Sequence, residues 1–189
     1  MPMKKVVVIL FILLFPAFAF NGRSTGNDTE HKMFISIPEV ALLAIHSENT
    51  DGAEFNSIAP NIAGGSIQFN QSNQTGNWIN YSSVINPNHY RKITATITGE
   101  IPPGLILKVN VSECRGKSMG EVGQGHRTVQ LSNYPAEIIS GIGSGYTGKG
   151  VENGHQVLYE IEVNNKDFYN NPQKNNTSVD VVFTLTDDN

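Results

Sequence analysis

The chain has 189 residues, of which 39% are hydrophobic and 16% charged, with a formal net charge of −4 and one cysteine, Cys114. This mild acidity argues against a nucleic-acid partner, which requires a basic face, and against docking on anionic lipid. A lone cysteine cannot form an internal disulfide, so we expect stability from an apolar core and from backbone pairing.

Residues 1–19 have the three parts of a secretory signal peptide. Lys4 and Lys5 supply the positive start, residues 6–15 are an unbroken apolar run, and residues 17–19 form an A-x-A cleavage signal. Cleavage after Ala19 removes two of the 13 basic residues and none of the 17 acidic ones, so the mature chain has a formal charge of −6. We expect an exported protein, periplasmic or extracellular at the cell surface, with no membrane span after cleavage.

The next part of the chain predicts a leader and two strands. Residues 20–32 are polar and aperiodic, which predicts a flexible leader before a single domain over residues 33–189. Residues 33–46 are apolar but interrupted by Pro38, which predicts a strand, a bend and a second strand over residues 40–45. Residues 47–77 are rich in Asn, Ser, Gly and Gln, with one short strand expected near residues 66–69.

From there on, apolar and polar residues alternate with a period of two, which is typical of half-buried strands. The clearest runs are residues 92–98, 105–111, 157–163 and 179–185, and further strands are predicted at 78–83, 129–131 and 137–142. The turn formers Pro102, Pro103 and Gly104 separate two of them. About 8–10 short strands predict an all-β fold, an antiparallel β-sandwich with immunoglobulin-like or jelly-roll connectivity. An eight-stranded barrel is the alternative.

A glycine-rich stretch, Gly143–Gly150, matches G-x-G-x-x-G and nearly matches a phosphate-binding loop. Such a loop opens a helix and places a hydroxyl after its lysine, where this chain has Gly150. Because residues 151–154 predict no helix, we interpret the stretch as a loop between strands.

The sequence predicts no metal site and no cofactor. The histidines stand singly, without the spacing of a zinc site. Asp51, Glu54 and residues 187–189 are candidate calcium ligands, but they lack the D-x-D-x-D spacing of a dedicated loop.

Catalysis is not expected either. No G-x-S-x-G elbow is present, and Glu160 and Glu162 are typical of the solvent face of a strand. Arg115 and Lys117 would lower the pKa of a reactive Cys114, but we interpret Cys114 as a small residue near a strand end. We therefore expect a protein that is not an enzyme.

Aromatic residues are the candidates for ligand binding, because flat rings stack on sugars. Tyr90, Tyr134 and Tyr146 fall in or beside predicted loops and are the candidate ligand-stacking residues. Trp78 and Tyr81 share a predicted strand at an odd separation, which puts them on opposite faces. We expect Trp78 to be the core tryptophan of the sandwich.

Several segments together resemble a known group of proteins: residues 78–83, 91–95, 101–105, 144–148 and 179–187. They are similar to a group of uncharacterised exported β-sandwich proteins of Gram-negative bacteria, especially Bacteroidetes, and more distantly to fimbrial or pilus-like subunits. The likeness covers about residues 33–187 and implies no catalytic residue. The paired cysteines of many chaperone–usher subunits are missing here.

We therefore expect an exported, non-enzymatic structural or adhesion module, fimbrial-like, whose partners are other copies of itself or surface proteins. Assembly by strand donation would use an open sheet edge. Residues 20–32 have the length of a donor strand but lack its alternating apolar residues. The alternative is a secreted carbohydrate-binding module that holds glycans with its loop tyrosines.

Overall fold

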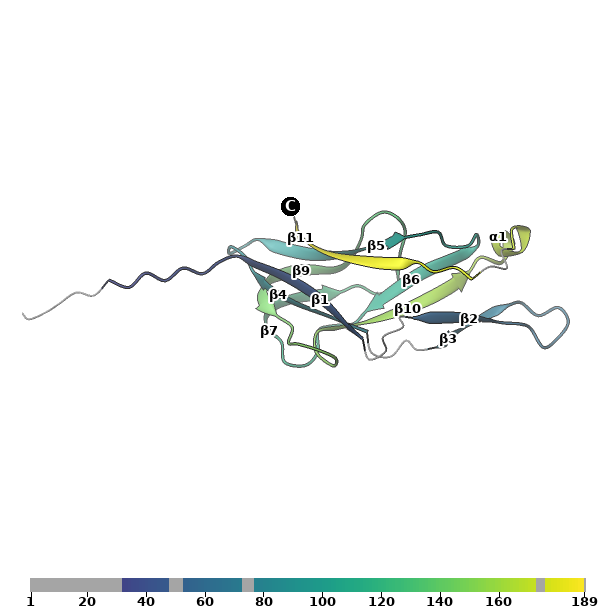
Figure 1. The fold of residues 1–189 in the computed structure, drawn as a ribbon, viewed down its shortest axis with the longest axis horizontal. Coiled ribbons are helices and arrows are strands. Elements are labelled where there is room, and N and C mark those ends of the chain that lie inside the picture. The colour runs from purple at the N-terminus through teal and green to yellow at the C-terminus, as the bar shows by residue number, and fades with distance from the viewer. Residues whose placement is uncertain (1–31, 48–52, 73–76, 173–175, 189) are drawn as a thin grey trace, which may run out of the picture. The chain divides into compact units, whose positions relative to one another are not determined.

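The computed structural model describes residues 32–47, 53–72, 77–172 and 176–188 and divides into two units, Met1–Ser36 and Ile37–Asn189. Within the described residues of the second unit there are eleven strands and one short helix, and all strand pairs are antiparallel (Figure 1). The predicted all-β, sandwich-like fold is confirmed. No helix in the described ranges is long and apolar enough to cross a membrane.

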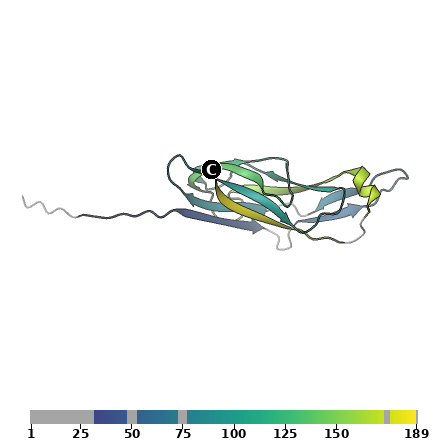
Figure 2. The same cartoon turned by 90° about the horizontal axis from the view of Figure 1, so that it is seen from above.

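Nine of the strands are joined by hydrogen bonds into one sheet that folds into two layers (Figures 1 and 2). The first layer has the order β1 (Val40–Ser47), β4 (Asn77–Val84), β10 (His155–Val163), β6 (Leu105–Val111) and β8 (Val129–Gln130). The second has the order β11 (Asp180–Asp188), β5 (Tyr90–Thr98), β9 (Ala136–Tyr146) and β7 (Met119–Gly125). The layers are joined where the end of β4 pairs with the end of β9.

The pairing decides between the two predicted connectivities. Strand β4 pairs with β10, β5 with β9 and β6 with β8, so the pairs are nested around β7. A long hairpin rolled up in this way is a jelly roll, here lacking one edge strand, and it differs from the strand order of an immunoglobulin domain. Strand β1 extends the first layer beside β4, and β11 extends the second beside β5.

The core lies between the layers and follows the period-two pattern. Alternate residues of β5 and β6 are buried there, together with residues of β4, β9 and β10. The core-facing row of β11, Val181, Phe183 and Leu185, packs against this cluster but stays only half buried. The alternation therefore located the core faces of β5, β6 and β11 correctly.

Trp78 is buried, but it does not belong to the core cluster. Ile79 and Tyr81 do, so the prediction that Trp78 and Tyr81 lie on opposite faces is confirmed. The burial of Trp78 agrees with its prediction as a core tryptophan, although Trp78 packs on the face of β4 opposite the cluster. The loop between β9 and β10 lies over the outer face of β4: the Gly150 amide donates to Asn80 Oδ1 at 2.7 Å, and Asn80 Nδ2 donates to the Asn153 carbonyl at 2.6 Å.

Other predictions need correction. The first strand expected before Pro38 is wrong, because residues 33–37 lie outside every strand. The short strand expected near residue 66 is β3 (Gln68–Ser72), which pairs with an unpredicted β2 (Glu54–Ile58) as a separate two-stranded sheet. Half of the expected Gly143–Gly150 loop is strand, since β9 continues to Tyr146.

The helix α1 (Asn165–Asn170) was also not predicted. It follows β10, and its Phe168 ring meets Phe69 of β3 edge to face, with ring centroids 6.3 Å apart. The Tyr169 hydroxyl accepts a hydrogen bond from the Ile67 amide at 2.9 Å. The helix therefore attaches the β2–β3 hairpin to the jelly roll.

Candidate functional site

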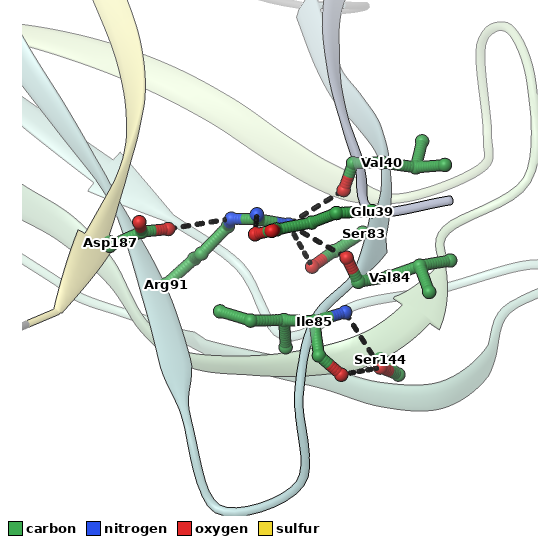
Figure 3. Close-up of polar contacts among 8 residues, drawn as sticks. All are labelled: Glu39, Val40, Ser83, Val84, Ile85, Arg91, Ser144 and Asp187. Carbon is green, nitrogen blue, oxygen red and sulfur yellow. Dashed lines mark hydrogen bonds and ion pairs between the residues drawn. The ribbon is translucent and has the colours of Figure 1, made fainter. Parts of the chain in front are cut away.

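Arg91, at the start of β5, is a buried cation at one end of the sandwich, with a side chain 5% exposed (Figure 3). It shares the face of β5 that carries Ile93, Ala95 and Ile97, so the alternation that builds the core turns its guanidinium inward. A buried charge is tolerated only when it is paired and hydrogen bonded, which requires acceptors close by.

Those acceptors come from three other parts of the chain. Arg91 Nε donates to Asp187 Oδ1 at 2.9 Å, and one terminal nitrogen, Nη2, donates to Glu39 Oε1. The other, Nη1, donates to the Val40 carbonyl at 2.6 Å, to Ser83 Oγ at 3.1 Å and to the Val84 carbonyl at 3.4 Å. Arg91 thus joins the beginning of β1, the end of β4 and the end of β11 (Figure 3).

Strands β1 and β11, which Arg91 joins, are the outermost strands of the two layers on one side of the sandwich, and we call this side the β1–β11 edge. Among the described residues, β1 pairs only with β4 and β11 only with β5, so each has one side without a partner strand. Strand β1 contains no Lys, Arg, Asp, Glu or Pro, the residues that usually protect an edge. Its core-facing Ile45 is 42% exposed, so the core is incompletely covered here.

The chain enters β1 through residues 33–37, which we call the apolar segment. Met33, Phe34, Ile35 and Ile37 are between 77% and 93% exposed. Met33, Ile35 and Ile37 recur with a period of two, the pattern of a strand with one apolar face. Large apolar side chains exposed next to one another are typical of an interaction site.

The three candidate tyrosines do not share a surface. Tyr90 lies beside Arg91 in a pocket of about 180 Å³ that is also lined by His89, Asn86 and three carboxylates, those of Glu39, Asp187 and Asp188. Tyr134 precedes β9 and Tyr146 ends it, so roughly 33 Å of strand separates them. All three rings are exposed. Of the three candidate tyrosines, the structure therefore places only Tyr90 beside the polar groups of this pocket, and the three rings form no common binding surface.

A second polar cluster lies inside the sandwich. His155 Nδ1 donates to the Ser112 carbonyl at 2.8 Å, and Nε2 lies 2.9 Å from the Tyr81 hydroxyl. Burial lowers the pKa of His155 and raises the pKa of Tyr81, so both side chains are neutral near pH 7. His155 is fully buried, and this cluster serves to connect strands.

Cys114 is half buried, and burial raises the pKa of its thiol. Burial therefore outweighs the lowering of the thiol pKa, and the thiol is not activated. Within the described ranges no three His, Cys, Asp or Glu side chains are grouped to hold a metal ion. Of the calcium candidates, Asp51 and Asn189 lie outside the described residues.

No protein-family model, curated protein or solved structure matches the chain.

The site was only partly visible in the sequence. Tyr90 was predicted as an exposed site residue, whereas Arg91 and Glu39 were not. The sequence did carry one signal for this site: Arg91 continues the alternating row of β5 that carries Ile93, Ala95 and Ile97. A charged side chain in a core-facing position requires polar partners, so this placement indicates a buried polar cluster.

Proposed function

We propose that this protein is an exported, non-enzymatic structural or adhesion module of the periplasm or the cell surface, fimbrial-like in that its copies associate. The observation that carries the proposal is the β1–β11 edge, an uncharged edge strand beside an incompletely covered core. An edge of this kind is a template for a further strand, and natural proteins normally protect it unless it is used.

The chemistry of the buried groups supports the same proposal. The charge of Arg91 is held by acceptors at the beginning of β1 and at the ends of β4 and β11, and the neutral His155 is bonded within the core. Both connect strands that are far apart in the sequence. A rigid frame that keeps an edge exposed suits a structural module.

The proposal is tested in the native host. We expect surface proteolysis of intact cells or osmotic release of the periplasm to yield a chain that begins at Phe20, and deletion of the gene to reduce attachment or envelope integrity. Complementation with the full chain should restore the phenotype, and complementation with a chain lacking residues 2–19 should not. A protein retained in the cytoplasm, or a deletion without effect on attachment and envelope, would refute the proposal.

A carbohydrate-binding module is the second candidate, favoured by the pocket at Tyr90. This pocket combines an exposed ring with an amide and carboxylates, the groups that bind the faces and hydroxyls of a sugar. We expect binding on a glycan array to be lost in Tyr90→Ala and kept in Tyr134→Ala, since Tyr134 lies in another loop. An array without any hit, or equal binding by both variants, removes this candidate.

A further inference from the structure

We propose that the outer face of β1 and β4 carries a binding groove for a small aliphatic carboxylate, a free fatty acid of short or medium chain. The groove has a volume of about 290 Å³ and is lined by β1, β4 and the loop that joins β9 to β10. The inference goes beyond the proposed function, because it assigns a ligand to a surface that shares no lining residue with the pocket at Tyr90.

The floor of the groove is aliphatic and comes from β1. Leu42, Ala44 and His46 pair with β4 on the face that carries Trp78, so they form the outer row of β1. Leu42 is 65% exposed and Ala44 is exposed as well. An alkyl chain laid along this row would cover apolar surface that water now contacts. Tyr81 also lines the groove, but its side chain belongs to the core, so its ring offers no platform for a sugar.

One wall of the groove is a loop that hydrogen bonds hold over β4. On one side of Lys149, Thr147 Oγ1 accepts a hydrogen bond from the Tyr81 amide at 2.9 Å. On the other side, the Gly150 amide donates to Asn80 Oδ1 at 2.7 Å. Gly150 has a φ of +86°, which a residue with a Cβ rarely adopts. The backbone on both sides of Lys149 is therefore held in place before a ligand binds, which lowers the entropic cost of binding.

The charges that line the groove favour an anion. Lys149 is exposed and forms no ion pair with a described residue, whereas Arg91, Lys92 and Lys108 are all paired. His46 lines the groove as well, and its ring carries an N–H donor in either charge state. No Asp or Glu is among the described residues that line it. In a chain with a net charge of −4, this groove is locally positive and complements a negative ligand.

The positive groups suit a ligand with a single negative charge. A lysine ammonium acts as a point charge, whereas the phosphates of nucleotides are usually held by backbone amides at the start of a helix. Here the element that follows Gly150 is the strand β10. The lysine of the glycine-rich stretch therefore suits a carboxylate, and a volume near the lower limit of ligand pockets suits one small molecule.

A carboxylate with an alkyl chain would use both parts of the groove. Leu42 and His46 lie at the two ends of the outer row, about 13 Å apart along the strand. The chain would lie on Leu42 and Ala44, and the carboxylate would accept hydrogen bonds from Lys149 and His46. The Ser82 hydroxyl, which also lines the groove, is a further donor. A free acid suits the groove better than a membrane lipid, because an acidic protein is repelled by an anionic bilayer surface.

The experiment titrates the mature full chain with octanoate, below the concentration at which it forms micelles, and follows the NMR shifts of backbone amides. We expect saturable shifts at residues 42–46, 80–82 and 147–150. Octanol keeps the chain without the charge, and acetate keeps the charge almost without the chain. Each should bind at least about fivefold more weakly than octanoate. Added salt should weaken the binding of octanoate and leave that of octanol unchanged, because the ion pair is open to water.

Substitutions separate the charged part of the groove from its floor. Lys149→Gln should weaken octanoate binding about threefold to fivefold and leave octanol binding unchanged. Ala44→Leu fills the groove and should weaken both ligands, with Leu42→Asn as a second variant of the floor in case the first does not fold. Lys166→Gln is the matched control, an exposed lysine on α1, and should leave both affinities unchanged.

Absence of octanoate binding overturns this inference, as does equal binding of octanol and octanoate or unchanged binding by Lys149→Gln. Shifts centred on Tyr90 would also overturn it, since they would place the ligand in the other pocket. Binding to anionic vesicles without binding of octanoate would assign the groove to a membrane and overturn it as well. None of these outcomes decides the proposed function, which is judged by export and attachment.

Discussion

At the level of single residues, Arg91 is the group on which the geometry of the β1–β11 edge depends. Its guanidinium is buried, whereas Glu39 and Asp187 are more than half exposed. The two ion pairs are therefore screened by water, and the bonds to Ser83 and to the carbonyls of Val40 and Val84 provide much of the stabilisation.

We predict that Arg91→Met lowers the free energy of unfolding by about 2–3 kcal/mol, because several buried acceptors lose their donor. Glu39→Gln should cost about 1 kcal/mol or less, since its carboxylate is largely solvated. Urea denaturation measures both values. Arg127→Met, at an exposed position, is the control and should change stability by no more than about 0.5 kcal/mol. Equal stability of Arg91→Met and the parent would contradict the prediction.

His155 makes stability depend on pH. Burial lowers its pKa in the folded state below the ordinary value of 6.5. The unfolded chain therefore takes up a proton near pH 6.5 that the folded chain does not. The contribution of His155 is complete above pH 6.5 and is lost as the pH falls toward its folded-state pKa, by at most about 1.4 kcal/mol per pH unit.

We predict that His155→Gln is less stable than the parent at pH 7 and has a flatter stability profile between pH 5 and 7. Urea unfolding at several pH values measures both effects. His89→Gln, the same replacement at an exposed histidine, should keep the profile of the parent. A His155→Gln profile as steep as that of the parent would assign the pH dependence to other groups.

Among the elements, the turn before β6 and the helix α1 depend on each other. Gly104 has a φ of +82°, and a Cβ at this position would lie 2.2 Å from the Phe168 amide nitrogen and 2.5 Å from its Cα. The Asn164 amide donates to the Gly104 carbonyl at 2.7 Å. The turn therefore needs glycine both for its backbone angle and for the close approach of the helix.

We predict that Gly104→Ala costs at least about 2 kcal/mol and loosens α1 together with the β2–β3 hairpin. Gly64→Ala is the matched control, because Gly64 has a φ of +88° but no atom within 4 Å of the added Cβ. It measures the backbone strain alone, about 1 kcal/mol. Hydrogen exchange at residues 165–170 reports the loosening. Equal costs for the two variants would show that the contact with Phe168 contributes nothing.

The elements also show where reasoning from the sequence succeeds. Strands β5, β6, β10 and β11 were located because each has one face on the core and one in solvent, which produces a clean alternation. Strand β7 was missed because three of its seven residues are glycine, and α1 because six residues are too few to show a helical period. The strand predicted over residues 33–37 has the right pattern but pairs with no strand among the described residues.

At the scale of the whole molecule, the nested pairing determines which residues meet. His155 lies opposite Ile79, and Asp187 opposite Arg91, although each pair is far apart in the sequence. Two alternating strands pair equally well in many combinations, so periodicity identifies strands without identifying their neighbours. The choice of a jelly roll over an immunoglobulin-like order comes from the sum of all contacts in the core.

The sequence by itself determined the fold class, the core faces of the main strands and the Pro102–Gly104 turn, because these depend on local alternation and on backbone stereochemistry. Only the tertiary structure decided the strand order, the inward position of Arg91 and its partners, the separation of the three tyrosines, and which face of β4 meets the core cluster. Each of these depends on which distant segments face one another. The apolar segment combines both sources: its sequence predicts a strand, whereas the structure leaves these residues outside every strand and exposed.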